Sequence, residues 1–179
     1  MGGWSAEREV SLMSGNGVAD ALESLGHRVT RIDMGRDVAE RIAEADADVV
    51  FNALHGTPGE DGTVQGMLDL MGVTYTHSGL ATSVVAIDKE LTKLALIPHG
   101  IRMPGGHIVD SASLFDGDPL PRPYVLKPVN EGSSVGVAIV REEGNYGNPI
   151  GRDVEGPWLH FDRLLAEPFI KGRELTAAV

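Results

Sequence analysis

No cysteine occurs among the 179 residues of this chain, so disulfide bonds and thiolate metal sites are excluded. The sequence also lacks any run of about 18 apolar residues that could form a membrane-spanning helix. Its amino terminus does not contain the apolar core of a signal peptide. These three absences predict a soluble, cytoplasmic protein.

Basic residues are scarce as well. Lys and Arg number 15 against 26 Asp and Glu, which gives a formal net charge of −11. Nucleic acids and anionic membranes bind to basic surfaces, so we expect neither as a partner. A small anionic ligand would have to be bound by local positive groups.

The first half of the chain alternates between helical spacing and short apolar runs. These stretches cover residues 10–25, 29–32, 46–54, 63–71, 73–75 and 81–96. Helices and strands that alternate at this length predict an open, Rossmann-like parallel α/β sheet. We assign it to a first domain at residues 1–97, with ligands expected beyond the carboxyl ends of its strands.

The second half differs in composition and pattern, because it contains most of the prolines and several short β runs. The β runs lie at residues 107–109, 124–127, 135–140 and 164–170, and a loop rich in Gly, Pro and Asn is expected at 145–158. We assign residues 98–179 to a second, incomplete α+β domain.

Both ends of the chain are abrupt. A parallel α/β domain normally opens with a strand, yet this chain begins at the glycine-rich turn that would follow it. At the other end, residues 174–179 resemble a strand without a connection. We therefore expect the chain to be a piece of a longer protein. The first strand and the carboxyl-terminal half of that protein would be absent from this sequence.

The segment at 127–136, Lys-Pro-Val-Asn-Glu-Gly-Ser-Ser-Val-Gly, is the most informative motif. Gly132 and Gly136 free backbone amides, Ser133 and Ser134 add hydroxyl donors, and a lysine supplies positive charge, as a phosphate-binding loop requires. Lys127 itself stands in an apolar strand, where its ammonium group would be costly without an anion.

Two other loops carry candidate binding groups. Glu7 follows the Gly2-Gly3 turn and could hold an ammonium group, although its spacing alone favours a capping turn in which it complements the dipole of the helix. His55 ends an apolar strand and could contact a substrate carboxylate or merely satisfy loop carbonyls. Glu60 and Asp61 are expected to hold the loop and the helix start together. The loop lacks the ligand spacing of a calcium site, and we predict no metal ligand in the chain.

Further candidates occur in both halves. Lys89 and Lys93 stand one helical turn apart, and either could reach a phosphate or remain solvated. Glu167 could accept from ribose hydroxyls, and the backbone near Phe169 and Ile170 could pair with an adenine edge. Alone, this stretch could be any edge hairpin.

Taken together, seven ordered motifs resemble the D-alanine:D-alanine ligases of the ATP-grasp superfamily. The motifs lie at residues 2–12, 53–56, 59–66, 75–79, 88–93, 127–136 and 172–176. The resemblance implies that ATP phosphorylates one D-alanine and that the amino group of a second D-alanine attacks the acyl phosphate. The product would be the D-alanyl-D-alanine of peptidoglycan synthesis.

The same resemblance implies roles for individual residues. Glu7 and Ser133 would be catalytic, with Glu7 orienting the ammonium of the first D-alanine, Ser133 tying that glutamate to the loop, and His55 lying near the substrate carboxylate. The residues expected to bind ATP are Lys89, Lys127, Ser133, Ser134, Val135, Gly136, Glu167, Phe169, Ile170 and Glu174.

The resemblance also sets limits. Ligands for Mg²⁺ or Mn²⁺ would follow the point where this sequence ends, so we expect these 179 residues alone to be inactive. A ligase that uses D-lactate, another ATP-grasp ligase, or a non-catalytic fragment that binds ATP or an amino acid remains an alternative. A homodimer is expected from the family alone.

Overall fold

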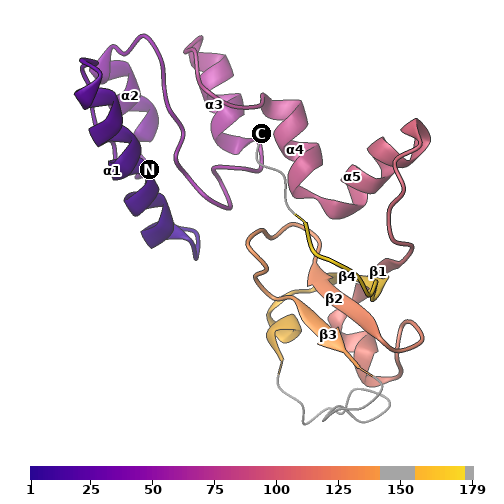
Figure 1. Cartoon of the computed structure of the whole chain (residues 1–179). Helices are drawn as coiled ribbons and strands as arrows, with labels where there is room; N and C mark the ends of the chain where they lie inside the picture. The colour runs from indigo at the N-terminus through magenta and orange to yellow at the C-terminus, as the bar shows by residue number, and fades with distance from the viewer. Residues whose placement is uncertain (142–155, 176–179) are drawn as a thin grey trace. The chain divides into compact units, whose positions relative to one another are not determined.

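The structure is a computed structural model, which describes residues 1–141 and 156–175. The chain forms two compact units, Met1–Ile87 and Asp88–Val179 (Figure 1). The division falls earlier than the predicted domain boundary at 97/98. It places the helix that carries Lys89 and Lys93 in the second unit, because both ammonium groups bind carbonyl oxygens there.

Four helices build the first unit: α1 (Arg8–Ser24), α2 (Val38–Ala45), α3 (Thr63–Met71) and α4 (Leu80–Ile87). Their core is formed by Ile42, Leu54, Val64 and Leu68. The predicted helices at 10–25 and 63–71 are confirmed as α1 and α3, whereas α2 was not predicted.

The strands expected in this unit are present only as extended backbone. The only ladder contact assigned among its described residues is a parallel bridge between Val50 and Tyr75. Segment 29–32 has no strand assignment, and neither does most of 46–54. The prediction that these segments pair into a hydrogen-bonded sheet is therefore wrong. The physical reason is that segments 27–34 and 47–54 line opposite sides of a cavity and do not pair with each other.

The single helix predicted at 81–96 is also wrong, because the structure has two helices there. Asp88 adopts an extended conformation (φ −90°, ψ 113°) between α4 and α5 (Lys89–Leu96). Its carboxylate accepts the amides of Glu90 and Leu91, both at 2.9 Å, and so begins a new helix.

The second unit is built on an antiparallel sheet in the order β1-β4-β2-β3. Its strands are β1 (His107–Asp110), β2 (Tyr124–Pro128), β3 (Ala138–Val140) and β4 (Arg163–Pro168). Short 3₁₀ segments lie at Ile97–His99, Ser111–Phe115 and Pro157–His160. Tyr124, Leu126, Val140, Trp158 and Leu164 are fully buried in its core.

These four strands confirm the β runs predicted in the second half, although β4 ends at Pro168 rather than at 170 and β3 is shorter than predicted. β3 starts at Ala138 rather than near 135, because Ser133, Ser134 and Gly136 have positive φ values that no strand accommodates. Glu174 and Leu175 are not in a strand, and the rest of that predicted strand lies outside the described residues. So does most of the loop predicted at 145–158.

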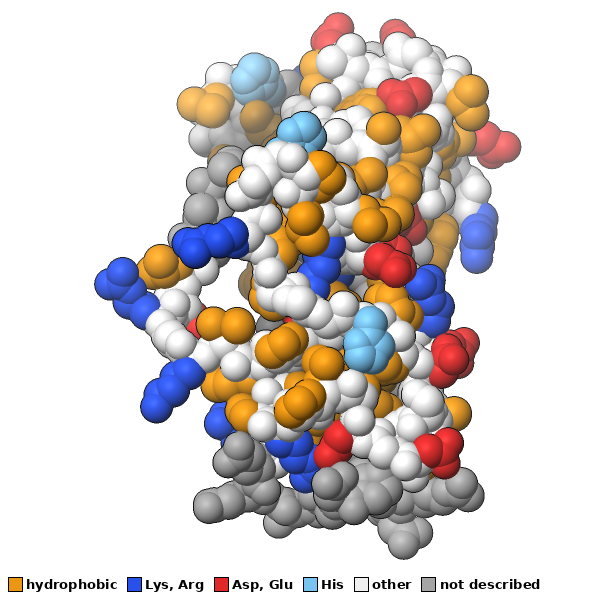
Figure 2. Space-filling model, turned by 90° about the vertical axis from the view of Figure 1, so that its right-hand side faces the viewer, with side chains coloured by type: hydrophobic (Ala, Val, Ile, Leu, Met, Phe, Trp, Pro, Cys, Tyr) orange, Lys and Arg blue, Asp and Glu red, His pale blue; other side chains and the backbone are white. Residues whose placement is uncertain are grey.

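Apolar side chains also remain at the surface of both units. Leu70 is 93% exposed in the first unit, and Leu94 is 66% exposed in the second. Figure 2 shows apolar side chains interspersed with charged ones on the face that it presents. None of the helices in the described part of the chain combines the length and the hydrophobicity of a membrane-spanning segment.

Candidate functional site

A cavity of about 590 Å³ lies in the first unit, at the carboxyl end of the 51–54 segment. It is lined by residues of α1, α3 and α4 and of the loops near them, including His55, Glu60, Gln65 and His77. Open α/β folds bind their ligands at this edge. The cavity is therefore the candidate substrate site of this unit.

Glu7 stands beside the loop that carries His55. A Cβ atom on Gly56 would lie 3.3 Å from the Glu7 Oε2 atom, which shows how close the carboxylate comes to the loop backbone. Ser5 joins the two segments, because its hydroxyl donates to the His55 carbonyl at 2.7 Å and accepts from the Glu7 amide at 3.2 Å. The structure thus brings together two residues that the sequence separates widely.

The loop itself is held by its own carboxylates. Glu60 Oε2 accepts the Gly56 amide at 2.9 Å, and Asp61 Oδ1 accepts the Thr63 amide at 2.9 Å. The prediction that Glu60 and Asp61 hold the loop and the start of α3 is confirmed. Gly56 has a φ of +63°, which favours glycine at this position.

Two buried polar atoms of this region have no hydrogen-bond partner among the described residues: His55 Nε2 and Gln65 Oε1. Gln65 is only 2% exposed, and its Nε2 atom donates to the Gly59 carbonyl at 2.8 Å. Unpaired buried atoms are costly unless a ligand or water satisfies them. Sequence reasoning missed Gln65, although an amide on the buried face of a helix was a signal for it.

Three charged side chains form a buried network in the second unit. The Glu167 carboxylate, 7% exposed, makes ion pairs with both Lys93 on α5 and Lys127 on β2. Lys93 also donates to the carbonyls of Pro104 at 2.7 Å and Gly105 at 3.2 Å. The anion that the burial of Lys127 required is therefore available within the protein.

Lys89 binds the backbone that leads into the phosphate-loop motif. Its ammonium donates to the carbonyls of Pro128 at 2.8 Å and Glu131 at 2.6 Å, with a longer contact to Val129 at 3.4 Å. Burial, followed by the nearby charge of Lys127, lowers the pKa of Lys89. Lys89 and Lys127 thus place two positive charges at the end of β2.

The loop after β2 has an unusual backbone. Ser133 (φ 48°) and Ser134 (φ 60°) are both left-handed, and the Val135 amide donates to the Gly132 carbonyl at 2.9 Å. Among the described residues, none accepts a hydrogen bond from the amides of Ser134 or Gly136. These two amides are the backbone donors that the loop could offer to a phosphate.

The remaining candidates lie at the end of β4. The Phe169 amide donates to the Pro123 carbonyl at 3.1 Å, so this amide is not available to an adenine edge. Arg141 lies over the Phe169 ring, 5.4 Å from its centroid. Ile170 and Glu174 are exposed.

Comparisons with known proteins identify relatives along the whole chain. A family model described as D-ala D-ala ligase N-terminus matches residues 35–78. The D-alanine–D-alanine ligase of Sphingopyxis alaskensis is 83% identical over all 179 residues. The chain is homologous to the D-alanine–D-alanine ligases. The enzyme of the same name from Zymomonas mobilis is 65% identical over the same length.

The chain spans little more than half of these ligases, 58% of the first and 56% of the second. Among solved structures, the D-alanine–D-alanine ligase of Bacillus anthracis aligns with a TM-score of 0.74 at 30% identity. The alignment covers 96% of this chain and 56% of that ligase. This likeness confirms the fold class, an α/β unit followed by an incomplete ATP-grasp unit.

A metal site is not formed by the residues that the structure describes. They contain no group of three or more His, Asp or Glu side chains placed to hold an ion. Mg²⁺ is commonly held by one or two carboxylates together with the phosphates of a nucleotide.

Proposed function

We propose that this chain is the part of an ATP-dependent D-alanine–D-alanine ligase that binds the first D-alanine and the phosphates of ATP. The observation that carries the proposal is the approach of Glu7 to the His55 loop, which lines a cavity with unpartnered polar atoms. A carboxylate and an imidazole on adjacent segments suit an amino acid, which carries an ammonium and a carboxylate group.

The reaction proposed for the whole ligase has two steps. The γ-phosphoryl group of ATP passes to the carboxylate of one D-alanine, which forms D-alanyl phosphate and releases ADP. The amino group of a second D-alanine then attacks the carbonyl carbon, and phosphate leaves as the peptide bond forms. Phosphorylation is needed because a free carboxylate is a poor electrophile.

The residues take the following proposed roles. Glu7 holds the ammonium of the first D-alanine, His55 lies near its carboxylate, and Ser133 links the glutamate to the loop. Lys89 and Lys127 neutralise phosphate charge, and the amides of the loop after β2 add donors. The part of the site proposed for ribose and adenine consists of Glu167, Phe169, Ile170 and Glu174.

The relatives support D-alanine rather than D-lactate as the second substrate, since those compared carry the name D-alanine–D-alanine ligase. ATP as the phosphoryl donor is supported by the Bacillus anthracis enzyme, whose structure was also solved in complex with ATP. We further propose small-molecule substrates only, a cytoplasmic location and a homodimer. No step is assigned to a metal held by the described residues.

A chimera tests the proposal. The chain replaces the matching part of the Sphingopyxis alaskensis ligase, to which it is 83% identical over 179 residues. We expect the chimera to release ADP in the presence of D-alanine and to form D-alanyl-D-alanine. Glu7→Gln should lower kcat/KM for D-alanine by about 100-fold or more, because a charge-assisted contact to the ammonium is lost.

The matched control is Glu9→Gln, which removes a carboxylate from an exposed position on the same helix. It should leave the kinetics unchanged. A chimera that releases ADP equally well without D-alanine, or that makes an ester with D-lactate in preference to a peptide, would contradict the proposal.

A further inference from the structure

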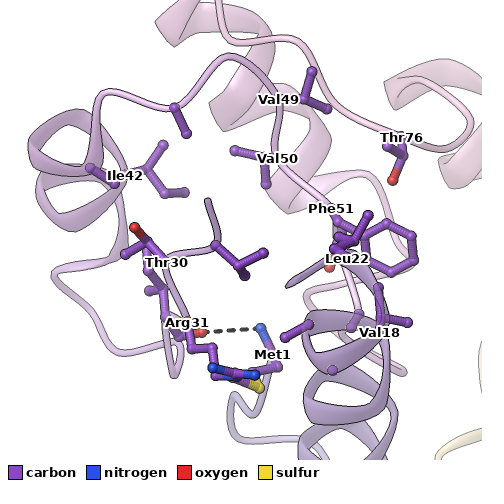
Figure 3. Close-up of a pocket in the computed structure, with 18 of the residues that line it drawn as sticks. Met1, Val18, Leu22, Thr30, Arg31, Ile42, Val49, Val50, Phe51 and Thr76 are labelled. Atoms are coloured by element: carbon purple, nitrogen blue, oxygen red, sulfur yellow. Dashed lines mark hydrogen bonds between the residues drawn. The ribbon is translucent and has the colours of Figure 1, made fainter. Parts of the chain in front are cut away.

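The parallel bridge between Val50 and Tyr75 sets which side chains meet at the candidate substrate site. The Thr76 amide donates to the Val50 carbonyl at 3.1 Å, and Figure 3 shows both residues among those that line the neighbouring apolar cavity. In a parallel pair, residues at equal distances beyond a bridge lie side by side, and every second residue points to the same face. Two residues beyond the bridge stand Asn52 and His77, which both line the candidate substrate site.

The Asn52 amide is held in one orientation by two backbone groups. Its Oδ1 atom accepts the Leu54 amide at 2.9 Å, and its Nδ2 atom donates to the Gly59 carbonyl at 2.9 Å. The reversed orientation would set the Nδ2 hydrogens against an N–H group and Oδ1 against a carbonyl oxygen. The amide nitrogen of Asn52 is therefore the atom that faces His77.

The atom of His77 that faces this amide is Nε2, at 2.7 Å from Asn52 Nδ2. An amide nitrogen only donates hydrogen bonds, so the imidazole nitrogen must accept here. The imidazole is therefore neutral and carries its proton on Nδ1. A protonated imidazole would place one N–H group against another.

This contact reaches the loop at residues 55–62, the His55 loop, through the Gly59 carbonyl. That carbonyl accepts from Asn52 Nδ2 and, at 2.8 Å, from Gln65 Nε2. Gly59 is buried, and a Cβ atom at this position would collide with the Leu54 side chain. Gly59 is thus a point at which the loop is seated closely on the segment that carries Asn52.

We propose that His77 is a positioning residue for the His55 loop. Its neutral imidazole accepts from Asn52 and so orients the amide that holds the Gly59 carbonyl. The loop then presents His55 to the carboxylate of the first D-alanine in one position rather than several. The inference rests on the proposed function for this last step, whereas the hydrogen-bond relay from His77 to Gly59 does not depend on it.

Other roles for His77 account for less of this geometry. A packing role would explain the edge-on contact with the Tyr75 ring, whose centroid lies 5.0 Å away, but not a nitrogen at hydrogen-bond distance from Asn52. A role as a metal ligand would need further donors, and the described residues contain no group of three or more His, Asp or Glu side chains that could hold an ion. The acceptor at Nε2 is therefore the property to test.

The first measurement determines the tautomer of His77 in the full chain. A histidine that is free in solvent favours the proton on Nε2, so the contact with Asn52 demands the less common form. Two-bond ¹H–¹⁵N correlations of the labelled chain at about pH 7.5 should show Nδ1 protonated and Nε2 unprotonated. A proton on Nε2 would overturn the proposal.

Two substitutions separate the acceptor from the ring. His77→Phe keeps an aromatic ring beside Tyr75 and removes the acceptor, whereas His77→Gln removes the ring and keeps an acceptor in its amide oxygen. The Gly59 and Glu60 amides both donate to the Gly56 carbonyl. Their hydrogen exchange should be about two- to tenfold faster in His77→Phe, a factor that corresponds to about one hydrogen bond. His77→Gln should return both amides toward the original rates.

The kinetic test uses the chimera described above. His77→Phe should raise KM for D-alanine by about two- to tenfold with little change in kcat, since the loop is displaced but no reacting group is removed. His77→Gln should restore KM. The matched control is His99→Phe, which changes an exposed histidine of the second unit and should leave both KM and the exchange rates unchanged.

A pH profile provides a readout that packing alone would not change. Protonation of His77 converts Nε2 from an acceptor to a donor, so the contact is lost toward the acid end of the range, about pH 5 to 8, in which histidines ordinarily titrate. The other titratable groups near the imidazole are Tyr75, Asp69, which accepts from the Tyr75 hydroxyl at 2.8 Å, and His55 and Glu60 at the same site. All of them remain in His77→Gln, so KM should rise less steeply toward acid pH in that variant than in the unsubstituted chimera.

Equal exchange rates and equal KM values in His77→Phe and His77→Gln would contradict the proposal, because the acceptor would then make no difference. The same conclusion would follow from identical pH profiles of the unsubstituted chimera and His77→Gln. A chimera that does not respond to D-alanine, while the tautomer and the exchange rates are as expected, would contradict the proposed function alone.

Discussion

At the scale of single residues, the Glu167 carboxylate is the centre of an ion-pair network in the second unit. Its buried carboxylate is shared by Lys93 and Lys127, which come from a helix and a strand. Removing the charge would leave two ammonium groups near each other with no carboxylate between them. Uncompensated buried charges are far more costly than the ion pair is stabilising.

We expect Glu167→Gln to lower the free energy of unfolding by about 2–4 kcal/mol, somewhat below the cost of breaking a fully buried pair because both lysines are partly exposed. Urea denaturation of the chain, followed by a signal from the second unit, measures this loss of free energy. Glu174→Gln, an exposed change of the same chemistry, should be neutral. Adding Lys93→Met to Glu167→Gln should recover part of the loss, and a purely additive double variant would contradict the network.

The sequence allowed the need for an anion at Lys127 to be predicted, but not the identity of that anion. The residues next to Lys127 in the sequence are enough to show that it stands in an apolar strand. Its partner depends on the register of β2 against β4, in which Val125 lies opposite Glu167 and Lys127 lies opposite Leu165. Glu167 is thus the diagonal neighbour of Lys127 on the sheet. A register between distant segments cannot be read from local spacing.

At the scale of elements, the break between α4 and α5 separates the two compact units of the chain. Asp88 ends one helical stretch and caps the next, and Lys89 beside it binds the carbonyls at the end of β2. The cap thus fixes where α5 begins, and with it the position of Lys89 and Lys93.

We expect Asp88→Ala to destabilise the second unit by about 0.5–2 kcal/mol, since two amides of the first turn lose their acceptor. Asp88→Asn should retain most of the stability, because asparagine caps about as well as aspartate. Chemical denaturation followed by far-ultraviolet circular dichroism compares the two variants. A loss of equal size in both would show that charge, rather than capping, is responsible.

Sequence patterns predicted the elements that depend on local chemistry better than those that depend on partners. α3 lies between Gly62 and Gly72, both with positive φ, and its limits were predicted closely. The 46–54 run was predicted as a strand from its apolar composition, yet among the described residues its one ladder contact is the bridge at Val50. Composition predicts that a segment is buried and extended, but ladder formation also requires a neighbouring edge. The Asp88 break was missed because the apolar spacing continues across it.

At the scale of the whole molecule, the chain has two separate cores. Leu68 is fully buried in the core of the first unit, and Leu126 is fully buried in that of the second. Among the described residues, the members of each core belong to one unit. Such units behave as separate folding blocks when their contacts with each other contribute little.

The separate cores predict that a cavity in one unit should leave the other unit intact. Leu126→Ala should cost about 2–5 kcal/mol by loss of buried contacts. Hydrogen exchange should then become faster in β1, β2 and β4 and remain unchanged in α1 and α3. Leu68→Ala, the matched change in the first unit, should produce the reverse pattern, with faster exchange in α1 and α3. Faster exchange throughout the chain from either substitution would mean that the two units unfold as one, because a shared transition transmits the loss of either core to every amide.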